Sequence, residues 1–86
     1  MEEEKIRKAL DLILRRDFDH RIPNKILNES NMLNYSFRID LDMDSLDTYK
    51  FIYHVEEELG VAIPDEKINN FEIPEDCVQY LLNIEN

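Results

Sequence analysis

The sequence predicts an all-α domain: a four-helix bundle with three longer helices, one short third helix and a long first loop. Two observations carry this prediction. Apolar residues recur at helical spacing through most of the chain, and Gly60 is the only glycine, which disfavours the turn-rich pattern of an all-β fold. A chain of 86 residues has the length of one domain, so we expect residues 1–86 to form a single unit.

The first half of the chain predicts one helix and a long connection. An amphipathic helix is expected at about residues 2–16, where one stripe is apolar. The connection over residues 17–43 carries Pro23 and several asparagines, yet it also holds apolar side chains that can pin it to a core. We therefore expect it to be packed, with a short helical turn at about residues 24–28.

Start and stop signals place the remaining helices. Asp44 is suited to cap a helix over residues 45–59, and Asp47 adds negative charge to its first turn, where the helix dipole favours it. Gly60 stands where a left-handed C-cap is expected. Pro64 opens a short helix at about residues 65–70, and Pro74 opens the last helix at about residues 74–84.

Charge is distributed unevenly along the chain. There are 20 acidic against 10 basic side chains, a net charge of −10. Residues 1–39 hold 7 acids and 8 bases, whereas residues 40–86 hold 13 acids and 2 bases. Such an acidic chain repels phosphate backbones, so we expect no nucleic-acid partner. The acidic half suggests either a surface for cationic proteins or a face that only keeps the protein in solution.

Several functional classes are disfavoured. The chain is short for an enzyme that must enclose its substrate, and Cys77 is its only cysteine, so no internal disulfide or thiolate metal cluster is expected. No apolar run approaches the roughly 20 residues that cross a bilayer, and the start Met1-Glu2-Glu3-Glu4 is unlike a signal peptide. We expect a cytoplasmic monomer without membrane insertion.

The helix over residues 45–59 has two apolar faces. One face is an ordinary core stripe, made by Thr48, Phe51, Ile52, Val55 and Leu59. The opposite face carries Leu46, Tyr49 and Tyr53 together with Lys50 and Glu57, and the acids Asp44, Asp47, Glu56 and Glu57 surround it. This second face either packs under the long first loop or forms an exposed docking surface, in which tyrosines supply apolar area with a polar tip.

Motifs for metal binding and catalysis are incomplete. In residues 40–44 an aspartate stands at every second position, as at the start of a calcium-binding loop. However, Ser45 and Phe51 occupy the positions of the required glycine and glutamate. Ser45 lacks a nucleophile elbow, and His54, nine residues along the same helix, is too far to act as its base. His20 and His54 show no ligand spacing, and Cys77 falls on a core stripe, so we expect a buried, unreactive thiol.

The segment around Ser45 resembles a known family. Asp44-Ser45-Leu46-Asp47 resembles the D-S-L-D signature of acyl carrier proteins, and the lead-in over residues 36–43 looks like theirs. Residues 56–66 resemble the stretch E-E-E-F-x-x-x-I-P-D-E that follows the signature. The resemblance covers about residues 36–82 and implies a four-helix bundle of acyl-carrier-protein type.

The resemblance implies a carrier rather than an enzyme. Ser45, flanked by Asp44 and Leu46, would bear a 4′-phosphopantetheine arm, which a phosphopantetheinyl transferase adds covalently from coenzyme A. The arm would carry acyl groups as thioesters, sheltered between the second and third helices of the family fold. Ketosynthases, acyltransferases or other acyl-processing enzymes with basic docking patches would then recognise the second helix, at Asp47, Tyr49, Lys50, Tyr53, Glu56 and Glu57.

Several residues depart from the family pattern. Asp42 stands where glycine is usual, and Tyr49-Lys50 replaces a small aliphatic residue followed by an acid. Tyr53 and His54 stand where methionine and alanine are frequent, and the first loop is longer. Because these changes fall largely on the docking face, they favour a dedicated set of partner enzymes over generic ones.

Three functions remain open at this point. The first is an acyl carrier for fatty-acid or related lipid or polyketide synthesis. The second keeps the fold but carries aminoacyl, peptidyl or D-alanyl groups, which Lys50 and the tyrosines leave open. The third is an unmodified helical adaptor that binds a protein through Tyr49 and Tyr53.

Overall fold

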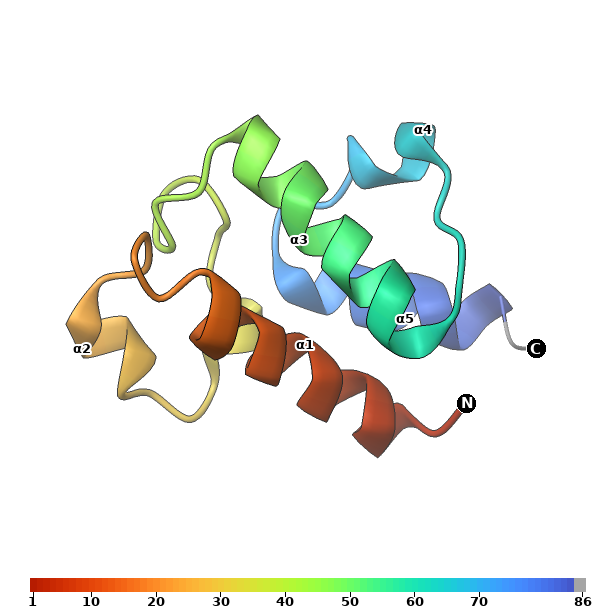
Figure 1. The fold of residues 1–86 in the computed structure, drawn as a ribbon, viewed down its shortest axis with the longest axis horizontal. Coiled ribbons are helices and arrows are strands. Elements are labelled where there is room, and N and C mark those ends of the chain that lie inside the picture. Colours follow the sequence, from red (N-terminus) through yellow and green to blue (C-terminus); the bar gives the residue numbers. More distant parts are fainter. Residues whose placement is uncertain (85–86) are drawn as a thin grey trace.

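The computed structural model describes residues 1–84, and within this range every regular element is helical (Figure 1). The three longer helices are α1 (Glu3–Asp17), α3 (Ser45–Leu59) and α5 (Pro74–Ile84). Three short elements complete them: α2 (Asn24–Leu27), a 3-10 helix η1 (Met32–Asn34) and α4 (Asp65–Ile68). The all-α prediction is confirmed, and the predicted bounds of the three longer helices agree with the structure to within one residue at each end.

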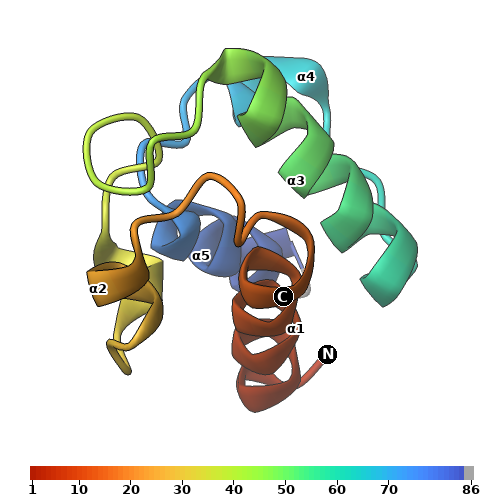
Figure 2. The same cartoon turned by 60° about the vertical axis from the view of Figure 1, so that its left-hand side comes forward.

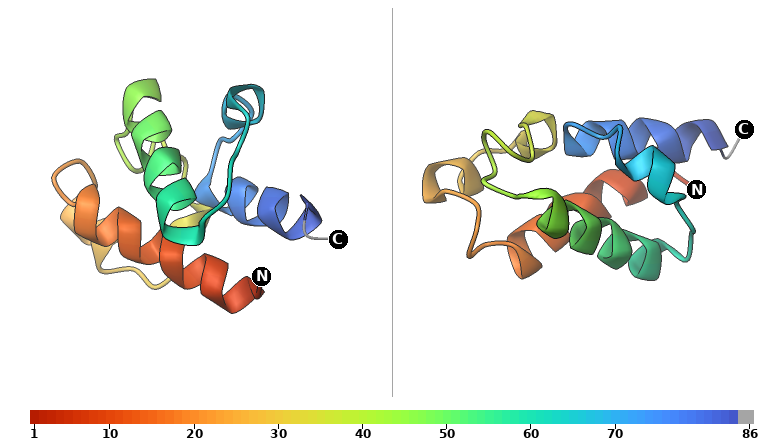
Figure 3. Two further views of the ribbon diagram at one scale, coloured as in Figure 1. Left: turned by 45° about the vertical axis from the view of Figure 1, so that its right-hand side comes forward. Right: turned by 90° about the horizontal axis from the view of Figure 1, so that it is seen from above.

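The three longer helices pack around a common core. Phe51 of α3 lies at its centre and is fully buried, with its ring centroid 6.0 Å from that of Phe18 and 5.6 Å from that of Phe37. Arg7 on α1 donates hydrogen bonds to both carboxylate oxygens of Glu75 on α5, which ties these two helices at the surface. In the left panel of Figure 3, α3 lies between α1 and α4.

The predicted core stripe of α3 is confirmed. Thr48, Phe51, Ile52 and Val55 are buried, and Leu59 is partly buried against the same core. This stripe faces the part of the core that α3 shares with α1, the helix with which α3 makes most of its helix–helix contacts. On the opposite face, Leu46 and Tyr53 are exposed, whereas Tyr49 is partly buried.

Both ends of α3 are fixed by local backbone chemistry. The Asp44 carboxylate accepts a hydrogen bond from the Asp47 N–H at 2.8 Å, and the Asp47 carboxylate accepts one from the Asp44 N–H at 3.2 Å. This reciprocal pair is a capping box, which satisfies N–H groups that have no partner inside the helix. Gly60 ends the helix in the left-handed region, at φ 67°, as predicted.

The connection between α1 and α3 is packed rather than loose, as predicted. Its apolar side chains enter the core, and Figure 2 shows it looping over the end of the bundle where α3 begins. The expected turn at 24–28 is present as α2, whereas η1 was not predicted. Phe37 anchors the last part, because its N–H donates to the Glu72 carbonyl at 3.0 Å while its carbonyl accepts from the Met43 N–H at 2.8 Å.

One residue of this connection has an unusual backbone. Asp42 adopts φ 56°, the left-handed region in which glycine is favoured. This is the position where the family resemblance predicts glycine. The turn that leads the chain into α3 therefore keeps its conformation although the glycine is replaced, because aspartate tolerates this region better than most residues do.

Candidate functional site

Ser45 is the first residue of α3, and its side chain is exposed to solvent. Its hydroxyl makes no hydrogen bond to any residue between 1 and 84, so it is available for chemistry. The backbone N–H groups of a first helical turn carry partial positive charge, which favours an anion attached at this point. The position therefore suits a phosphate ester on the Ser45 oxygen.

The capping box holds Ser45 in place. The Asp44 carboxylate accepts hydrogen bonds from the backbone of this turn, chiefly from the Asp47 N–H, and these bonds lower the pKa of Asp44 below its usual value. Asp47 is only 7% exposed, and its carboxylate also lies 3.3 Å from Arg21 Nε. Asp44 and Asp47 are thus both committed to the start of α3, which fixes the backbone on either side of Ser45.

A groove of about 680 Å³ opens beside Ser45. One wall is the start of α3, the other is the end of α4 with the chain that follows it, and residues 36–39 close the third side. Apolar side chains dominate the exposed lining, and polar groups lie at intervals between them. The lining consists of Ser36, Phe37, Arg38, Ile39, Ser45, Thr48, Tyr49, Ile68, Asn69, Phe71 and Glu72.

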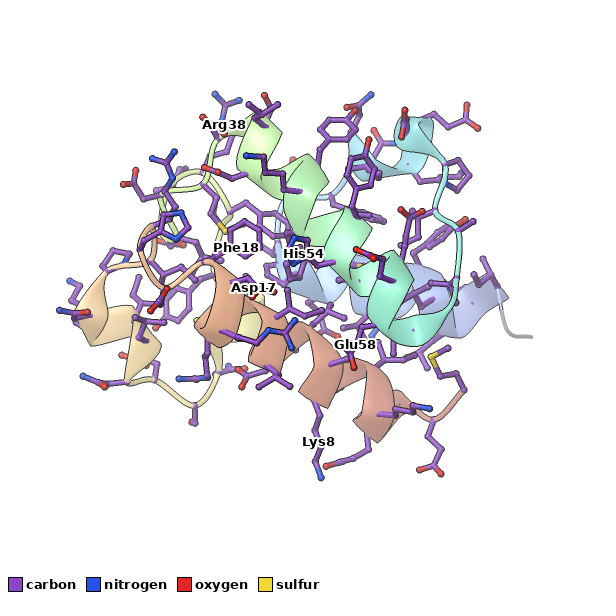
Figure 4. The ribbon with its side chains drawn as sticks, viewed as in Figure 1. Lys8, Asp17, Phe18, Arg38, His54 and Glu58 are labelled. Carbon is purple, nitrogen blue, oxygen red and sulfur yellow. The ribbon has the colours of Figure 1, made fainter. Side chains whose placement is uncertain are left out.

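Arg38 is the only basic residue in this lining, and its position in the sequence did not mark it as a site residue. Its side chain is exposed and forms no ion pair with any acid of the described chain. Figure 4 shows Arg38 next to the beginning of α3, the end of the helix that carries Ser45. A guanidinium at this point adds positive charge to that of the helix N-terminus. Its place in the chain, seven residues before Ser45, gave no sign of this proximity.

Leu46 and Tyr53 are strongly exposed for apolar residues, at 65% and 47%. With Lys50 and Glu57, which are also exposed, they follow the spacing of one helical stripe on α3, here called the exposed stripe. The alternative that Leu46 and Tyr53 pack under the first loop is therefore wrong. Lys50 makes no ion pair with a described residue, so this stripe is free to meet another molecule.

Two other predicted contact residues are engaged inside the protein. The Glu56 carboxylate accepts a hydrogen bond from the Ile63 N–H at 2.6 Å, which ties the end of α3 to the following segment. Tyr49 is half-buried, and its hydroxyl donates a hydrogen bond to the side-chain oxygen of Asn69. Together with Asp47, these residues contribute to the local structure, and their contact with partners remains a prediction.

His54 lies nine residues beyond Ser45, in the C-terminal half of α3. Its Nδ1 is 2.8 Å from Asp17 Oδ2, and its ring centroid is 5.7 Å from that of Phe18 (Figure 4). Hydrogen bonds from Arg16 and His54 lower the pKa of Asp17 to about 2. This histidine joins α3 to α1 and is not directed toward Ser45. His20 is exposed, with its ring stacked 6.4 Å from Phe18.

Cys77 is fully buried, as predicted, and burial raises the pKa of its thiol to about 12. A thiol in this environment is not a nucleophile at neutral pH. No group of three or more His, Cys, Asp or Glu side chains within residues 1–84 is arranged to hold a metal ion. In the same part of the chain, no helix combines the length and the hydropathy needed to cross a bilayer.

Comparison with known proteins places the chain in a family. Residues 25–81 match the model of the family described as "Phosphopantetheine attachment site". The acyl carrier protein of Treponema pallidum (strain Nichols) is 53% identical over 49 residues, which are 57% of this chain and 63% of the relative. The acyl carrier protein of Treponema denticola is 51% identical over the same shares of the two chains.

A more distant relative is matched over a longer segment. The acyl carrier protein of an Arthrobacter species (strain FB24) is 36% identical over 58 residues, which are 67% of this chain and 72% of the relative. The matches to the two Treponema proteins cover less than two thirds of those proteins. These relatives do not favour the unmodified adaptor or the aminoacyl carrier as the function of the chain.

The residues of the site fit the group that gives the family its name. The exposed Ser45 hydroxyl can accept a phosphodiester, Arg38 and the N–H groups of the first turn of α3 supply positive charge on the side of the groove, and the groove can receive a flexible arm. Family membership itself implies a covalent 4′-phosphopantetheine prosthetic group. By the match over residues 25–81 and by the named relatives, this chain belongs to the acyl carrier protein family.

Proposed function

We propose that this protein carries acyl groups on a 4′-phosphopantetheine arm attached to Ser45, for fatty-acid synthesis or a related lipid or polyketide pathway. The observation that carries the proposal is an exposed serine hydroxyl at a capped helix N-terminus, beside a groove of about 680 Å³. The protein itself performs no catalytic step in this proposal. A separate transferase supplies the base and the coenzyme A, which agrees with a serine that has no histidine beside it.

Each residue around Ser45 has a role in holding the arm. The capping box of Asp44 and Asp47 keeps the backbone at Ser45 rigid and presents the hydroxyl to the transferase. Arg38 and the N–H groups of the first turn of α3 balance the negative charge of the phosphodiester. When attached, the arm supplies a thiol that holds the acyl group as a thioester.

The exposed stripe of α3 is the proposed docking surface. Leu46 and Tyr53 would enter apolar depressions of a partner, and their exposure of 65% and 47% leaves this area open to contact. Lys50 and Glu57 would fix the orientation through opposite charges. The partners are a phosphopantetheinyl transferase and acyl-processing enzymes such as ketosynthases and acyltransferases, and we place the protein in the cytoplasm as a monomer.

Incubation with coenzyme A, magnesium and a phosphopantetheinyl transferase tests the attachment. Intact-mass analysis should show one added phosphopantetheinyl group on the natural protein and none on the Ser45→Ala variant. Ser30→Ala is the matched control, because Ser30 is exposed in the connection between α1 and α3, and it should be modified fully. A mass gain that persists in Ser45→Ala would refute attachment at this residue.

The cargo needs a second experiment. The phosphopantetheinylated protein should be loaded by an acyl-carrier-protein synthetase with a fatty acid, and should not be loaded by amino-acid adenylating enzymes. Loading by the adenylating enzymes alone would show that the protein carries aminoacyl groups and not fatty acyl groups. Native protein that is isolated without any arm would instead support an adaptor.

A further inference from the structure

We propose that the hydrogen bond between Tyr49 and Asn69 closes the groove beside Ser45 and restricts the carrier to short acyl groups. This inference rests on the proposed function and concerns the class of cargo. The Tyr49 hydroxyl, on α3, donates to the Asn69 side-chain oxygen at the end of α4, so the bond links the two walls of the groove. We call this contact the Tyr49–Asn69 bridge.

The bridge spans the groove that Ser45 lines, into which an arm on Ser45 can fold. Tyr49 follows Ser45 by four residues, so the two side chains lie on the same side of α3, about 6 Å apart along its axis. Both line the groove, and Thr48 lies between them on the same wall. The acyl group is attached to the thiol at the far end of the arm, so an arm that folds back along this groove brings the acyl group against the Tyr49 ring before it can enter the gap between α3 and α4.

Beneath the bridge there is packed core. Phe37 and Ile68 line the groove but are only 2% exposed, and Thr48 is 7% exposed. The Thr48 hydroxyl is already used, since it donates to the Asp44 carbonyl at 3.0 Å. To insert between α3 and α4, a long acyl chain would have to break the bridge and displace Ile68. A short acyl group can remain in the groove above them.

The expected selectivity is moderate. A single exposed hydrogen bond contributes little net free energy, which corresponds to a change of about 2- to 10-fold in an equilibrium constant. The Tyr49 ring adds a steric element, because its centroid lies 6.4 Å from that of Tyr53 and the ring is half-buried. The bridge thus biases the cargo toward short chains and does not exclude long chains completely.

The test compares thioester accessibility in carriers loaded with butanoyl, octanoyl or dodecanoyl groups. Hydroxylamine cleaves an accessible thioester, and a chain that inserts into the protein slows this cleavage by withdrawing the thioester from solvent. We expect the natural protein to cleave the dodecanoyl thioester at nearly the rate of the butanoyl thioester. In Tyr49→Phe and in Asn69→Ala, dodecanoyl cleavage should slow by about 2- to 10-fold while butanoyl cleavage stays unchanged.

Two comparisons make the test specific. The double variant should behave like either single variant, since both remove the same bond. Tyr80→Phe is the control for loss of a tyrosine hydroxyl, because Tyr80 lies on α5, outside the groove lining, and its hydroxyl has no hydrogen-bond partner within residues 1–84. This control should cleave like the natural protein with all three cargoes.

Either of two results would overturn the inference. The first is protection of the dodecanoyl thioester in the natural protein to the same degree as in the variants. The second is equal cleavage of all cargoes in every variant. Both results require a loaded carrier, so they leave the proposed function intact, whereas failure of the proposed function would appear earlier, as an absence of mass gain at Ser45. Circular dichroism should confirm that each variant retains its helices.

Discussion

The two ends of α3 differ in how they are held. At the end that begins with Ser45, hydrogen bonds between Asp44 and Asp47 fix the backbone, while Ser45 and Leu46 remain exposed. At the other end, side chains reach other parts of the molecule: His54 contacts Asp17 on α1, and Glu56 accepts from the Ile63 N–H. The first end is stabilised locally, and the second end by tertiary contacts.

This difference shows how a small domain can leave a side chain at a helix start exposed while the backbone around it stays fixed. A cap uses backbone groups and short polar side chains, so it leaves the side chains of the exposed stripe uncovered. The tertiary contacts that would cover such a surface are placed two to three turns further along the helix. The exposed hydroxyl is thus held rigidly although nothing packs on it.

The largest expected effect comes from the residue that connects the two ends. Phe51 contacts Phe37, which lines the groove, and Phe18, which lies beside His54. Phe51→Ala should lower the free energy of unfolding by about 3–5 kcal/mol, because it removes a fully buried ring from the core. Urea denaturation followed by circular dichroism measures the loss. Tyr53→Ala, at an exposed ring of the same helix, should cost far less, and equal losses would contradict the assignment of the core face.

The next effect tests the local stabilisation of the Ser45 end. Asp44→Ala should lower the free energy of unfolding by roughly 0.5–2 kcal/mol, since it removes the cap of α3. It should also slow transferase modification of Ser45, because the first turn would fray. Asp19→Ala removes an exposed carboxylate that caps no helix and serves as the control. A loss of stability without slower modification would show that the cap does not position Ser45.

A smaller effect is expected at the turn that leads into α3. Asp42 has a left-handed backbone at φ 56°, so Asp42→Gly should be more stable than Asp42→Ala by about 1 kcal/mol. Thermal unfolding of the two variants measures this difference directly. Equal stability of the two variants would show that this turn relaxes to an ordinary conformation.

The smallest effect concerns the tertiary contacts at the His54 end. Asp17 has its pKa lowered from 3.8 to about 2, so its contacts stabilise the folded state above pH 3.8, and this contribution is lost as the pH falls toward 2. Across that interval, the natural protein should lose more stability than Asp17→Asn. Because the contacts lie near the surface, added salt should reduce the difference between the two proteins. Parallel acid titrations of the two proteins, with and without salt, measure both effects.

Local signals explain why much of the fold could be predicted. Asp44 and Gly60 mark the two ends of α3 through interactions within a few residues, and Pro74 marks the start of α5. The exposure of Ser45 and the burial of Cys77 likewise followed from their positions on helices. In each case the decisive contact or periodicity lies within one or two helical turns, and such patterns are visible in a single sequence.

The parts that could not be predicted depend on distant segments. Arg38 shares a groove with Ser45 because the connection folds back over the start of α3. Asn69 meets Tyr49 twenty residues away, through a hydroxyl that the pattern had placed on a docking face. Glu56 also looked like part of an acidic rim, but the chain after Gly60 directs the Ile63 N–H to its carboxylate. None of these pairs has a periodicity that a sequence pattern can reveal.

The amino-acid sequence alone determined the helices, the core stripe of α3 and the serine that resembles a phosphopantetheine site. These features depend on capping, on helical spacing and on a short signature, all of which are local along the chain. Only the tertiary structure decided which face of α3 stays exposed and which residues form the groove beside Ser45. It also decided which carboxylates accept hydrogen bonds from within the protein. The physical reason is that contacts between distant segments depend on how the helices and the long connection pack, and packing is a property of the whole core.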